Sequence, residues 1–257
     1  MKTPELLLPA GSLAKMRAAY DFGADAVYAG QPRYSLRARN NEFKLEQLAS
    51  GIAEAHARGK KFYVASNLLP HNAKVKTYLA DMAPVIAMQP DALIMADPGL
   101  IDMIRDRFPD VPVHLSVQAN TVNWASVRFW GKMGIKRVIL SRELSLDEVA
   151  EIRQQCPEME LEVFVHGALC IAYSGRCLLS GYFNHRDPNQ GTCTNSCRWD
   201  YKLKPDNEAE ATPGMTGSNF PPMVVEEAKR PGELMPIEED EHGTYILNSR
   251  DLRAIEH

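Results

Sequence analysis

Ala26-Val-Tyr-Ala29, a helical segment over Leu45–Arg58, Gly59 and Lys61-Phe-Tyr-Val-Ala65 together form one strand–helix–strand unit. The two short runs are apolar, as buried strands are, whereas the segment between them has apolar residues at helical spacing. Gly59 is placed to end the helix just before the second strand, because glycine readily takes up the left-handed backbone of a helix C-terminus. Two strands joined in this way are predicted to lie parallel in one sheet, with a right-handed crossover.

The same unit recurs along most of the chain. Seven or eight such units close most naturally into a barrel, whereas an open dinucleotide-binding sheet usually has G-x-G-x-x-G after its first strand. The first turn here is Pro9-Ala-Gly-Ser12. We therefore predict an α/β fold, a (β/α)8 TIM-type barrel that is incomplete at its C-terminus and has a Cys-rich metal-binding insertion. The predicted strands are residues 5–8, 26–29, 61–65, 92–95, 113–117, 137–140 and 161–165, and the predicted helices are residues 13–22, 45–58, 75–88, 100–107, 124–133 and 146–155.

Local signals at the helix ends agree with this pattern. Ser145 precedes Leu146-Asp-Glu148, which predicts an N-cap and a capping box. Gly23, Gly59 and Gly134 each follow a predicted helix and precede the next strand.

Polar side chains follow most of the predicted strands within a few residues. In a barrel of this type these positions lie at the C-terminal face, where active sites are built. Loops are commonly polar, so any one such residue is weak evidence, but the set as a whole predicts a convergent polar site with an apolar rim. The candidates are Arg33, Arg37, Asn67, Gln118, Asn120, Arg142, Glu143 and His166.

Four of the five cysteines, Cys170, Cys177, Cys193 and Cys197, lie close together in a polar stretch that contains several glycines. Core cysteines need apolar neighbours, and disulfides need an oxidising compartment. We find neither a signal peptide nor a membrane-length apolar run, and so predict a cytoplasmic protein in which clustered thiols bind a metal or form a redox pair. Only Cys193 and Cys197 have the close spacing of a zinc knuckle, so the pattern favours an iron–sulfur cluster and leaves zinc open.

The composition limits the choice of partner without fixing it. A formal charge of -4 argues against a broad basic surface for nucleic acid, although a local basic patch is compatible with it.

The predicted organisation is residues 1–169 as barrel units, 170–201 as the cysteine segment, 202–243 as an acidic proline-rich insertion or loop, and 244–257 as the truncated start of the last barrel unit. On this prediction a partner fills the gap, or the chain is part of a longer protein.

Several motifs resemble peptidase family U32, the collagenase-like peptidases. The signature match is Glu162-Val-Phe-Val-His-Gly-Ala-Leu-Cys170 followed by Tyr173-Ser-Gly-Arg-Cys-Leu-Leu-Ser180. Further similar motifs are Pro9-Ala-Gly11, Tyr28-Ala-Gly30, Ser141-Arg-Glu-Leu-Ser145, Gly191-Thr-Cys-Thr-Asn-Ser-Cys197 and Tyr245-Ile-Leu-Asn-Ser-Arg-Asp-Leu252. The resemblance thus covers nearly the whole chain.

Within the family, the sequence is most similar to members that hydroxylate the wobble uridine of bacterial tRNA to 5-hydroxyuridine, with prephenate as co-substrate. The resemblance implies a 4Fe-4S cluster on Cys170, Cys177, Cys193 and Cys197. It also implies that members continue with another barrel strand and a C-terminal β domain, so that this chain lacks part of the machinery. Other relatives act in ubiquinone and ribosomal RNA hydroxylation.

Roles for the candidate residues follow from this reaction. Prephenate has two carboxylates, which suit the forked donors of arginine. Amide side chains are expected to orient the substrate hydroxyl or the uracil edge, and residues 33–41 mix cations with an aromatic, as an RNA-contacting loop does. The predicted carboxylate ligands are Arg33, Arg37 and Arg142, and the predicted orienting residues are Asn67, Gln118 and Asn120.

Glu143 or His166 is the predicted acid or base. The same two residues with a metal are also the best candidates for a peptidase, although the chain has neither H-E-x-x-H nor G-x-S-x-G. A third possibility is a non-catalytic scaffold in which the cluster only holds the insertion to the barrel. Cys156 and His114 are predicted to be structural.

Overall fold

A computed structural model describes residues 3–36, 41–166, 172–205, 223–239 and 245–247. The chain divides into two compact units, residues 1–196 and residues 197–257. The first unit contains a seven-stranded sheet, and the second contains a four-stranded sheet.

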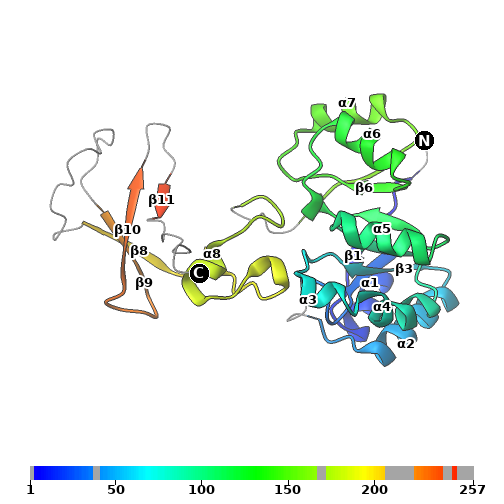
Figure 1. Ribbon diagram of the computed structural model, residues 1–257, viewed down its shortest axis with the longest axis horizontal. Helices are drawn as coiled ribbons and strands as arrows, with labels where there is room; N and C mark the ends of the chain where they lie inside the picture. The colour runs from blue at the N-terminus through cyan, green and yellow to red at the C-terminus, as the bar shows by residue number, and fades with distance from the viewer. Residues whose placement is uncertain (1–2, 37–40, 167–171, 206–222, 240–244, 248–257) are drawn as a thin grey trace. The chain divides into compact units, whose positions relative to one another are not determined.

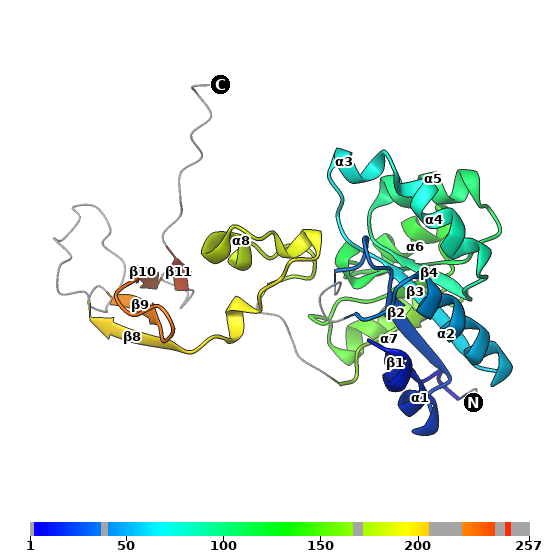
Figure 2. The same ribbon diagram turned by 90° about the horizontal axis from the view of Figure 1, so that it is seen from below.

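The sheet of the first unit is parallel throughout, and its strands follow one another in chain order. It curls into a half-barrel of the TIM type, with helices on its outer side; Figure 2 shows α1 and α2 outside β1–β3. The strands are β1 (Leu7–Pro9), β2 (Ala26–Gly30), β3 (Lys61–Ser66), β4 (Ala92–Met95), β5 (Val113–Leu115), β6 (Arg137–Ile139) and β7 (Glu160–Glu162). The helices are α1 (Leu13–Asp21), α2 (Leu45–Ala57), α3 (Asn72–Val75), α4 (Tyr78–Ala87), α5 (Pro98–Arg107), α6 (Trp124–Lys132) and α7 (Leu146–Gln155), as labelled in Figure 1.

All seven predicted barrel strands are confirmed. The side chains of a strand point alternately to its two faces, which explains why this unit has two buried layers. In β3, Phe62 and Val64 belong to the large core cluster that includes helix residues, whereas Tyr63 and Ala65 belong to a smaller cluster. Side chains alternate between the two faces of a strand, so the smaller cluster lies on the inner side of the curl. Both faces are buried, which is why the strands are nearly continuous apolar runs.

The helix-end signals are confirmed as well. Ser145 accepts a hydrogen bond from the Glu148 backbone N–H and the Glu148 side chain accepts one from the Ser145 backbone N–H, which completes the capping box of α7. Gly23, Gly59 and Gly134 have φ of 97°, 64° and 80°. These left-handed conformations are accessible to glycine without strain.

The structure differs from the prediction at two places in this unit. The helix expected over residues 75–88 begins only at Tyr78, as α4, and a separate short helix, α3, precedes it; between the two, Thr77 donates a hydrogen bond to Asp81 and contacts the Tyr34 hydroxyl. The last strand is shorter than expected, because β7 ends at Glu162 and the apolar side chains of Val163, Phe164 and Val165 are exposed. Among the described strands, β7 pairs only with β6.

The second unit is an antiparallel sheet in the order β11-β10-β9-β8. Its strands are β8 (Tyr201–Pro205), β9 (Met223–Glu227), β10 (Leu234–Glu239) and β11 (Tyr245–Leu247). Residues 202–243, predicted as an insertion or loop, therefore contain strands. Tyr245–Leu247 is a strand as expected, but it pairs with β10 rather than with the parallel sheet. These strands were not predicted, because prolines and acidic residues are typical of loops. In the structure Val224 and Val225 are buried, and Lys204 forms an ion pair with Glu226 on the neighbouring strand.

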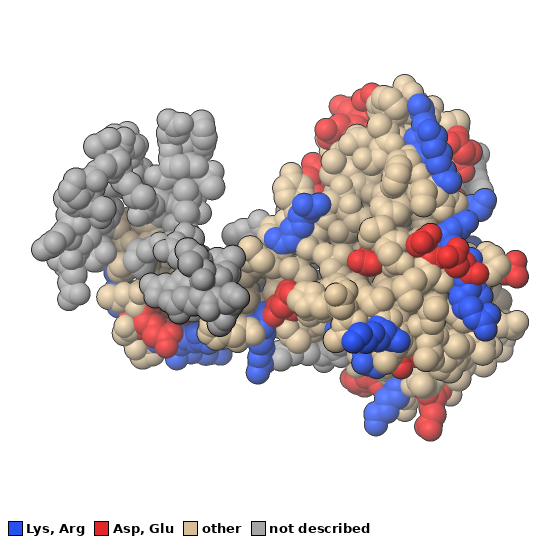
Figure 3. Space-filling view, viewed as in Figure 1, with Lys and Arg blue, Asp and Glu red and all other residues tan. Residues whose placement is uncertain are grey.

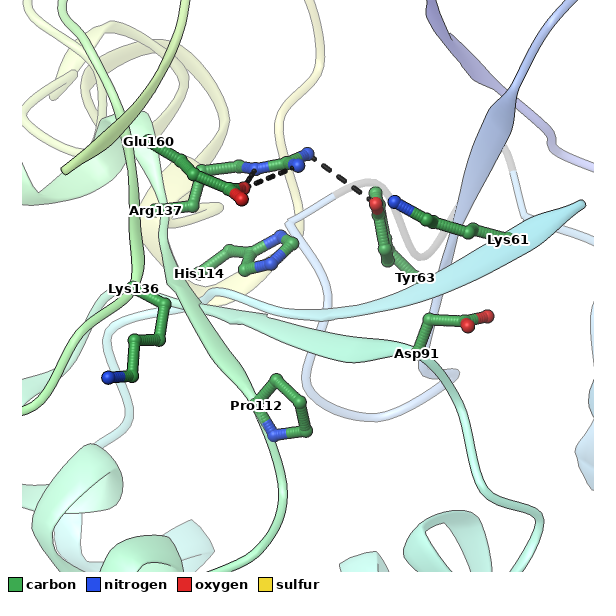
Figure 4. Close-up of a pocket in the computed structure, with 8 residues that line it drawn as sticks. All are labelled: Lys61, Tyr63, Asp91, Pro112, His114, Lys136, Arg137 and Glu160. Carbon is green, nitrogen blue, oxygen red and sulfur yellow. Dashed lines mark hydrogen bonds and ion pairs between the residues drawn. The ribbon is translucent and has the colours of Figure 1, made fainter. Parts of the chain in front are cut away.

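A charged cluster crosses the N-terminal end of the parallel sheet, where it lines a hollow of about 250 Å³ (Figure 4). At its centre Arg137, at the start of β6, binds Glu5 at 2.6 Å and Glu160 at 2.7 Å. Glu5 precedes β1 and also binds Lys61 at 2.6 Å and the Tyr63 hydroxyl at 2.8 Å. These contacts connect the first strand with β3, β6 and β7.

The cluster contains groups whose charge depends on their surroundings. Burial lowers the pKa of His114 to about 4, and the ring lies edge-on to Tyr63 at 4.8 Å. Burial raises the pKa of Glu162 to about 7, and the Arg137 guanidinium 3.5 Å away only partly offsets that effect. Although burial opposes its charge, hydrogen bonds from Arg137, Lys61 and Tyr63 hold the pKa of Glu5 at about 2. His114 is therefore a neutral residue of the strand interior, as its place in a predicted strand suggested.

Replacing Arg137 with alanine is expected to destabilise the fold by about 3 kcal/mol, because it leaves several partly buried carboxylates without their shared cation. Urea unfolding followed by circular dichroism measures the change. Arg17→Ala is the matched control, because Arg17 pairs with Glu54 at the surface and its loss is expected to cost less than about 1 kcal/mol. Equal losses in the two variants would contradict a special role for Arg137.

Glu162→Gln is expected to stabilise the fold increasingly as the pH rises from about 4.5 to about 7. The folded chain holds the Glu162 proton more tightly than the unfolded chain does, so wild-type stability falls across this window by at most about 1.4 kcal/mol per pH unit, and the glutamine variant escapes that loss. Unfolding free energies measured at several pH values test this. A difference in unfolding free energy between the two proteins that does not change with pH would refute this prediction.

Candidate functional site

The loops at the opposite, C-terminal end of the strands carry a hydrogen-bonded group of amides and a hydroxyl. Asn67, which follows β3, donates to Ser116 Oγ at 3.2 Å and to Gln118 Oε1 at 3.1 Å, both of which follow β5. The Asn67 Oδ1 accepts from the backbone N–H of Leu36 at 3.2 Å, and Ser116 Oγ also donates to Gln118 Oε1. The sequence prediction that Asn67 and Gln118 lie together at one end of the sheet is thus matched by the geometry.

This network fixes the orientation of Gln118. Its Oε1 accepts two hydrogen bonds, so its Nε2 is held as a donor, and in the described chain no partner is recorded for that nitrogen. Gln118 is partly exposed, so the group is within reach of a ligand. A fixed N–H donor of this kind suits a carbonyl or carboxylate oxygen.

Four of the six buried side-chain atoms that lack a hydrogen-bond partner among the described residues lie at this end of the sheet; the other two, His114 Nδ1 and Glu162 Oε2, belong to the charged cluster. The four atoms at this end follow β2, β5 and β6 and find no hydrogen-bond partner in the described part of the chain: Asn41 Oδ1, Asn120 Oδ1, Thr121 Oγ1 and Ser141 Oγ. Buried polar groups are rarely left unsatisfied, so this end is where water or a ligand would complete them. Thr121 was missed by sequence reasoning, because a threonine after a strand carries no signal of its own.

The arginines predicted to bind carboxylates have different surroundings. Arg33 forms an ion pair with Asp81 at 2.7 Å, and Asp81 also accepts a hydrogen bond from the Tyr34 hydroxyl at 2.6 Å. Arg33 therefore already has a carboxylate partner, 48 residues away in the sequence. Arg142 lies over the Phe164 ring, with 4.1 Å between its guanidinium carbon and the ring centroid. Arg37 lies outside the described residues.

Glu143 and His166 are both exposed, and in the described part of the chain no hydrogen bond or ion pair joins them. An acid–base pair or a metal-assisted peptidase site requires side chains that converge on one substrate. The structure offers no such convergence for these two residues.

The segment that follows β7 docks on the loops of the amide group. Asn120 Nδ2 donates to the carbonyl of Ser174, and Gly175 lies so close to Gln118 that a Cβ there would be 3.2 Å from the Gln118 carbonyl oxygen. Gly175 has φ of 72°, which also favours glycine. The start of the cysteine segment therefore rests directly on Gln118.

A second contact holds the same segment to the loop after β3. The backbone N–H of Leu69 donates to the Asn189 carbonyl at 3.2 Å, and Gln190 Nε2 donates to the Leu69 carbonyl. Asn189 Nδ2 donates to the Cys177 carbonyl at 3.1 Å. Asn189 thus connects the barrel loop to Cys177, in agreement with the predicted position of the cysteines at the barrel mouth.

Three of the four clustered cysteines are described, and Cys170 lies outside the described residues. Cys177 and Cys193 are partly buried in the first unit, and Cys197 is exposed at the start of the second. Within the described ranges, no three side chains of His, Cys, Asp or Glu form a metal-binding group. The Asn195 backbone N–H donates to the Cys193 sulfur at 3.4 Å. Hydrogen bonds of this kind also occur at the sulfur ligands of metal clusters.

Cys156 stands apart from this group, as predicted. It is buried in the core and its thiol donates to the Trp124 carbonyl at 3.5 Å.

Charge is dispersed over the visible surface. On the face drawn in Figure 3, the described Lys and Arg side chains alternate with Asp and Glu rather than forming one broad basic area. Among the residues that the structure describes, no helix has both the length and the apolar character needed to cross a membrane.

Known proteins with similar sequences are associated with RNA modification. The chain is 62% identical to tRNA hydroxylation protein P of Escherichia coli (strain K12), with all of this chain and 60% of the relative aligned. It is 60% identical to tRNA hydroxylation protein P of Haemophilus influenzae (strain ATCC 51907 / DSM 11121 / KW20 / Rd), with 99% of this chain and 60% of the relative aligned. The chain thus spans about 60% of the length of these curated relatives.

The fold also has a solved counterpart. The structure of the U32 peptidase Mk0906 matches with a TM-score of 0.53 at 15% identity, covering 63% of this chain and 70% of that one, which supports the fold alone. The sequence profile of peptidase family U32 matches residues 11–257. Both the profile and the identity to the relatives extend over nearly the whole chain, so the protein belongs to peptidase family U32.

Proposed function

We propose that this chain is the barrel part of an RNA-modifying enzyme that hydroxylates the wobble uridine of tRNA to 5-hydroxyuridine, with prephenate as co-substrate. The observation that carries the proposal is the docking of the cysteine segment on Gln118 and on the loop after β3. This contact brings a thiol-bearing segment next to a fixed polar donor at the end of the sheet where barrel enzymes bind substrate. The names of the two similar relatives supply the substrate class.

The chemistry explains why thiols belong next to this donor. Adding an oxygen atom to C5 of a pyrimidine needs redox or electrophilic assistance, which a 4Fe-4S cluster would supply when bound. Cys170, Cys177, Cys193 and Cys197 are the proposed ligands, and zinc is the alternative metal. We place the enzyme in the cytoplasm, where thiols stay reduced.

The protein groups at the mouth have separate proposed roles. Gln118 Nε2 is the donor for an oxygen of the uracil or of prephenate, while Asn67 keeps Gln118 in position. Arg142 is a proposed carboxylate ligand, because its guanidinium lies over the half-exposed ring of Phe164 just after β7. Asn120 holds the cysteine segment through Ser174 and has an unsatisfied Oδ1 left for substrate.

Glu143 and His166 remain the proposed acid and base, and they would have to be brought to the substrate by its binding. Exposed aromatic side chains support contact with unpaired bases. Phe164 lies under Arg142 and Tyr173 precedes the docked Ser174, and both rings are about half exposed. Bases of single-stranded RNA stack on such rings.

Gln118→Leu is expected to reduce 5-hydroxyuridine and its derivatives in tRNA at least about tenfold, since the loss of a substrate-orienting hydrogen bond typically costs more than 1.4 kcal/mol. A strain that lacks the gene is complemented with the wild-type or the variant gene, and its tRNA is analysed by nucleoside mass spectrometry. Gln154→Leu, at an exposed position of α7, is the matched control and is expected to restore the modification fully.

Two results would contradict this proposal at different levels. Unchanged 5-hydroxyuridine derivatives in the deletion strain would exclude the hydroxylase function. Loss in the deletion strain but full activity of Gln118→Leu would keep the function and remove Gln118 from the substrate site.

A further inference from the structure

The stretch that follows β7 places an aromatic ring directly under an arginine. The Arg142 guanidinium carbon lies 4.1 Å from the centroid of the Phe164 ring, the shortest of the seven arginine–aromatic contacts among the described residues. At this separation the guanidinium has to lie flat on the ring, because an edge-on approach would put an N–H group between the two and move the carbon further out. The pair is therefore a stack, with the plane of the guanidinium set by the ring.

The pairing of β6 with β7 brings these two residues together. The Leu140 backbone N–H donates to the Glu162 carbonyl at 2.9 Å, and each of these residues is followed two positions later by one member of the stack. The contact between Arg142 and Phe164 thus continues the sheet pairing into the loops. It lies at the C-terminal end of the strands, where barrel enzymes bind substrate.

Polar groups without a partner adjoin the stack. Ser141 directly precedes Arg142, and its backbone N–H donates to the Thr121 carbonyl at 3.3 Å. The side chains of Ser141 and Thr121 are both buried, and in the described part of the chain their hydroxyls have no hydrogen-bond partner. Thr121 follows Asn120, which holds the segment after β7 through Ser174. The stack therefore belongs to the same mouth as the amide group.

Stacking leaves the hydrogen-bonding groups of the arginine available. A guanidinium has five N–H donors, all in its plane, and contact of its face with an aromatic ring uses none of them. Two parallel hydrogen bonds from arginine to a carboxylate require the fork of donors to meet the carboxylate oxygens in a fixed geometry. Because Phe164 sets the plane of Arg142 in advance, less side-chain freedom is lost when a carboxylate binds.

We propose that Phe164 is a positioning residue that holds the Arg142 guanidinium in the orientation needed to bind a carboxylate of the co-substrate. This inference rests on the carboxylate-binding part of the proposed function and not on the RNA. It is compatible with base stacking on the same side chain, since Arg142 covers one face of the ring and Phe164 is still 42% exposed.

The test measures dissociation constants of the full chain for prephenate, and for malonate as a simpler dicarboxylate, by isothermal titration calorimetry. Phe164→Leu is expected to raise both constants about fivefold, the worth of one cation–π contact, whereas Phe164→Trp retains the affinity because indole offers a better face. Phe129→Leu is the matched control and is expected to equal wild type, because this exposed ring of α6 contacts Trp130.

A double-mutant cycle shows whether Phe164 acts through Arg142. Arg142→Gln is expected to weaken dicarboxylate binding at least about tenfold, because it removes a charge-assisted pair of hydrogen bonds. Phe164→Leu added to Arg142→Gln is expected to have no further effect, because the ring then has no guanidinium to hold.

Two results would overturn the proposal alone: equal affinity of Phe164→Leu and wild type, or a further loss when Phe164→Leu is added to Arg142→Gln, which would mean that the ring touches the ligand itself. If Phe164→Leu does not fold, Arg142→Lys decides the point, since lysine keeps the charge without the planar stack, and wild-type affinity would then overturn the proposal.

The same measurements separate this inference from the proposed function. A wild-type chain that binds neither dicarboxylate would overturn the inference together with the proposed co-substrate. Dicarboxylate binding that depends on Phe164, combined with unchanged 5-hydroxyuridine derivatives in the deletion strain, would refute the hydroxylase function and leave the positioning role of Phe164 standing.

Discussion

The contact between Arg137 and Glu5 closes an otherwise open arrangement of strands. Among the described residues, the hydrogen-bonded sheet runs from β1 to β7 without joining its two edges. A side chain at the start of β6 instead reaches the residue that precedes β1, over a sequence separation of 132 residues. At the other end of the same curled sheet, the loops after β3 and β5 come close enough for Asn67 to reach Ser116 and Gln118.

The two ends of the sheet carry out separate tasks. At the N-terminal end, opposite charges neutralise one another around Arg137 and connect β1 with β3, β6 and β7. At the C-terminal end, amide and hydroxyl groups are left incompletely paired beside a thiol-bearing segment. This division matches the general behaviour of barrel enzymes, in which one face stabilises and the other binds substrate.

The strand and helix pattern was readable from the sequence because it depends on neighbouring residues. Apolar runs, the capping box at Ser145 and the glycines after the helices are all local signals. The pairing of Arg33 with Asp81 was not readable, because the two residues are 48 positions apart and either could have been solvated. The fixed orientation of Gln118 likewise depends on Asn67, 51 positions away. The antiparallel strands β9 and β10 were hidden by prolines that usually mark loops.

Hydrogen bonds to backbone groups attach the cysteine segment to the barrel. Two of these, from Gln190 to Leu69 and from Lys74 to Gln190, span 121 and 116 residues. Contacts of such sequence separation form late, after the local strand–helix units that carry their partners. The barrel therefore serves as the template that brings Cys177 to its native position, because Asn189, which binds the Cys177 carbonyl, is itself held by the loop after β3.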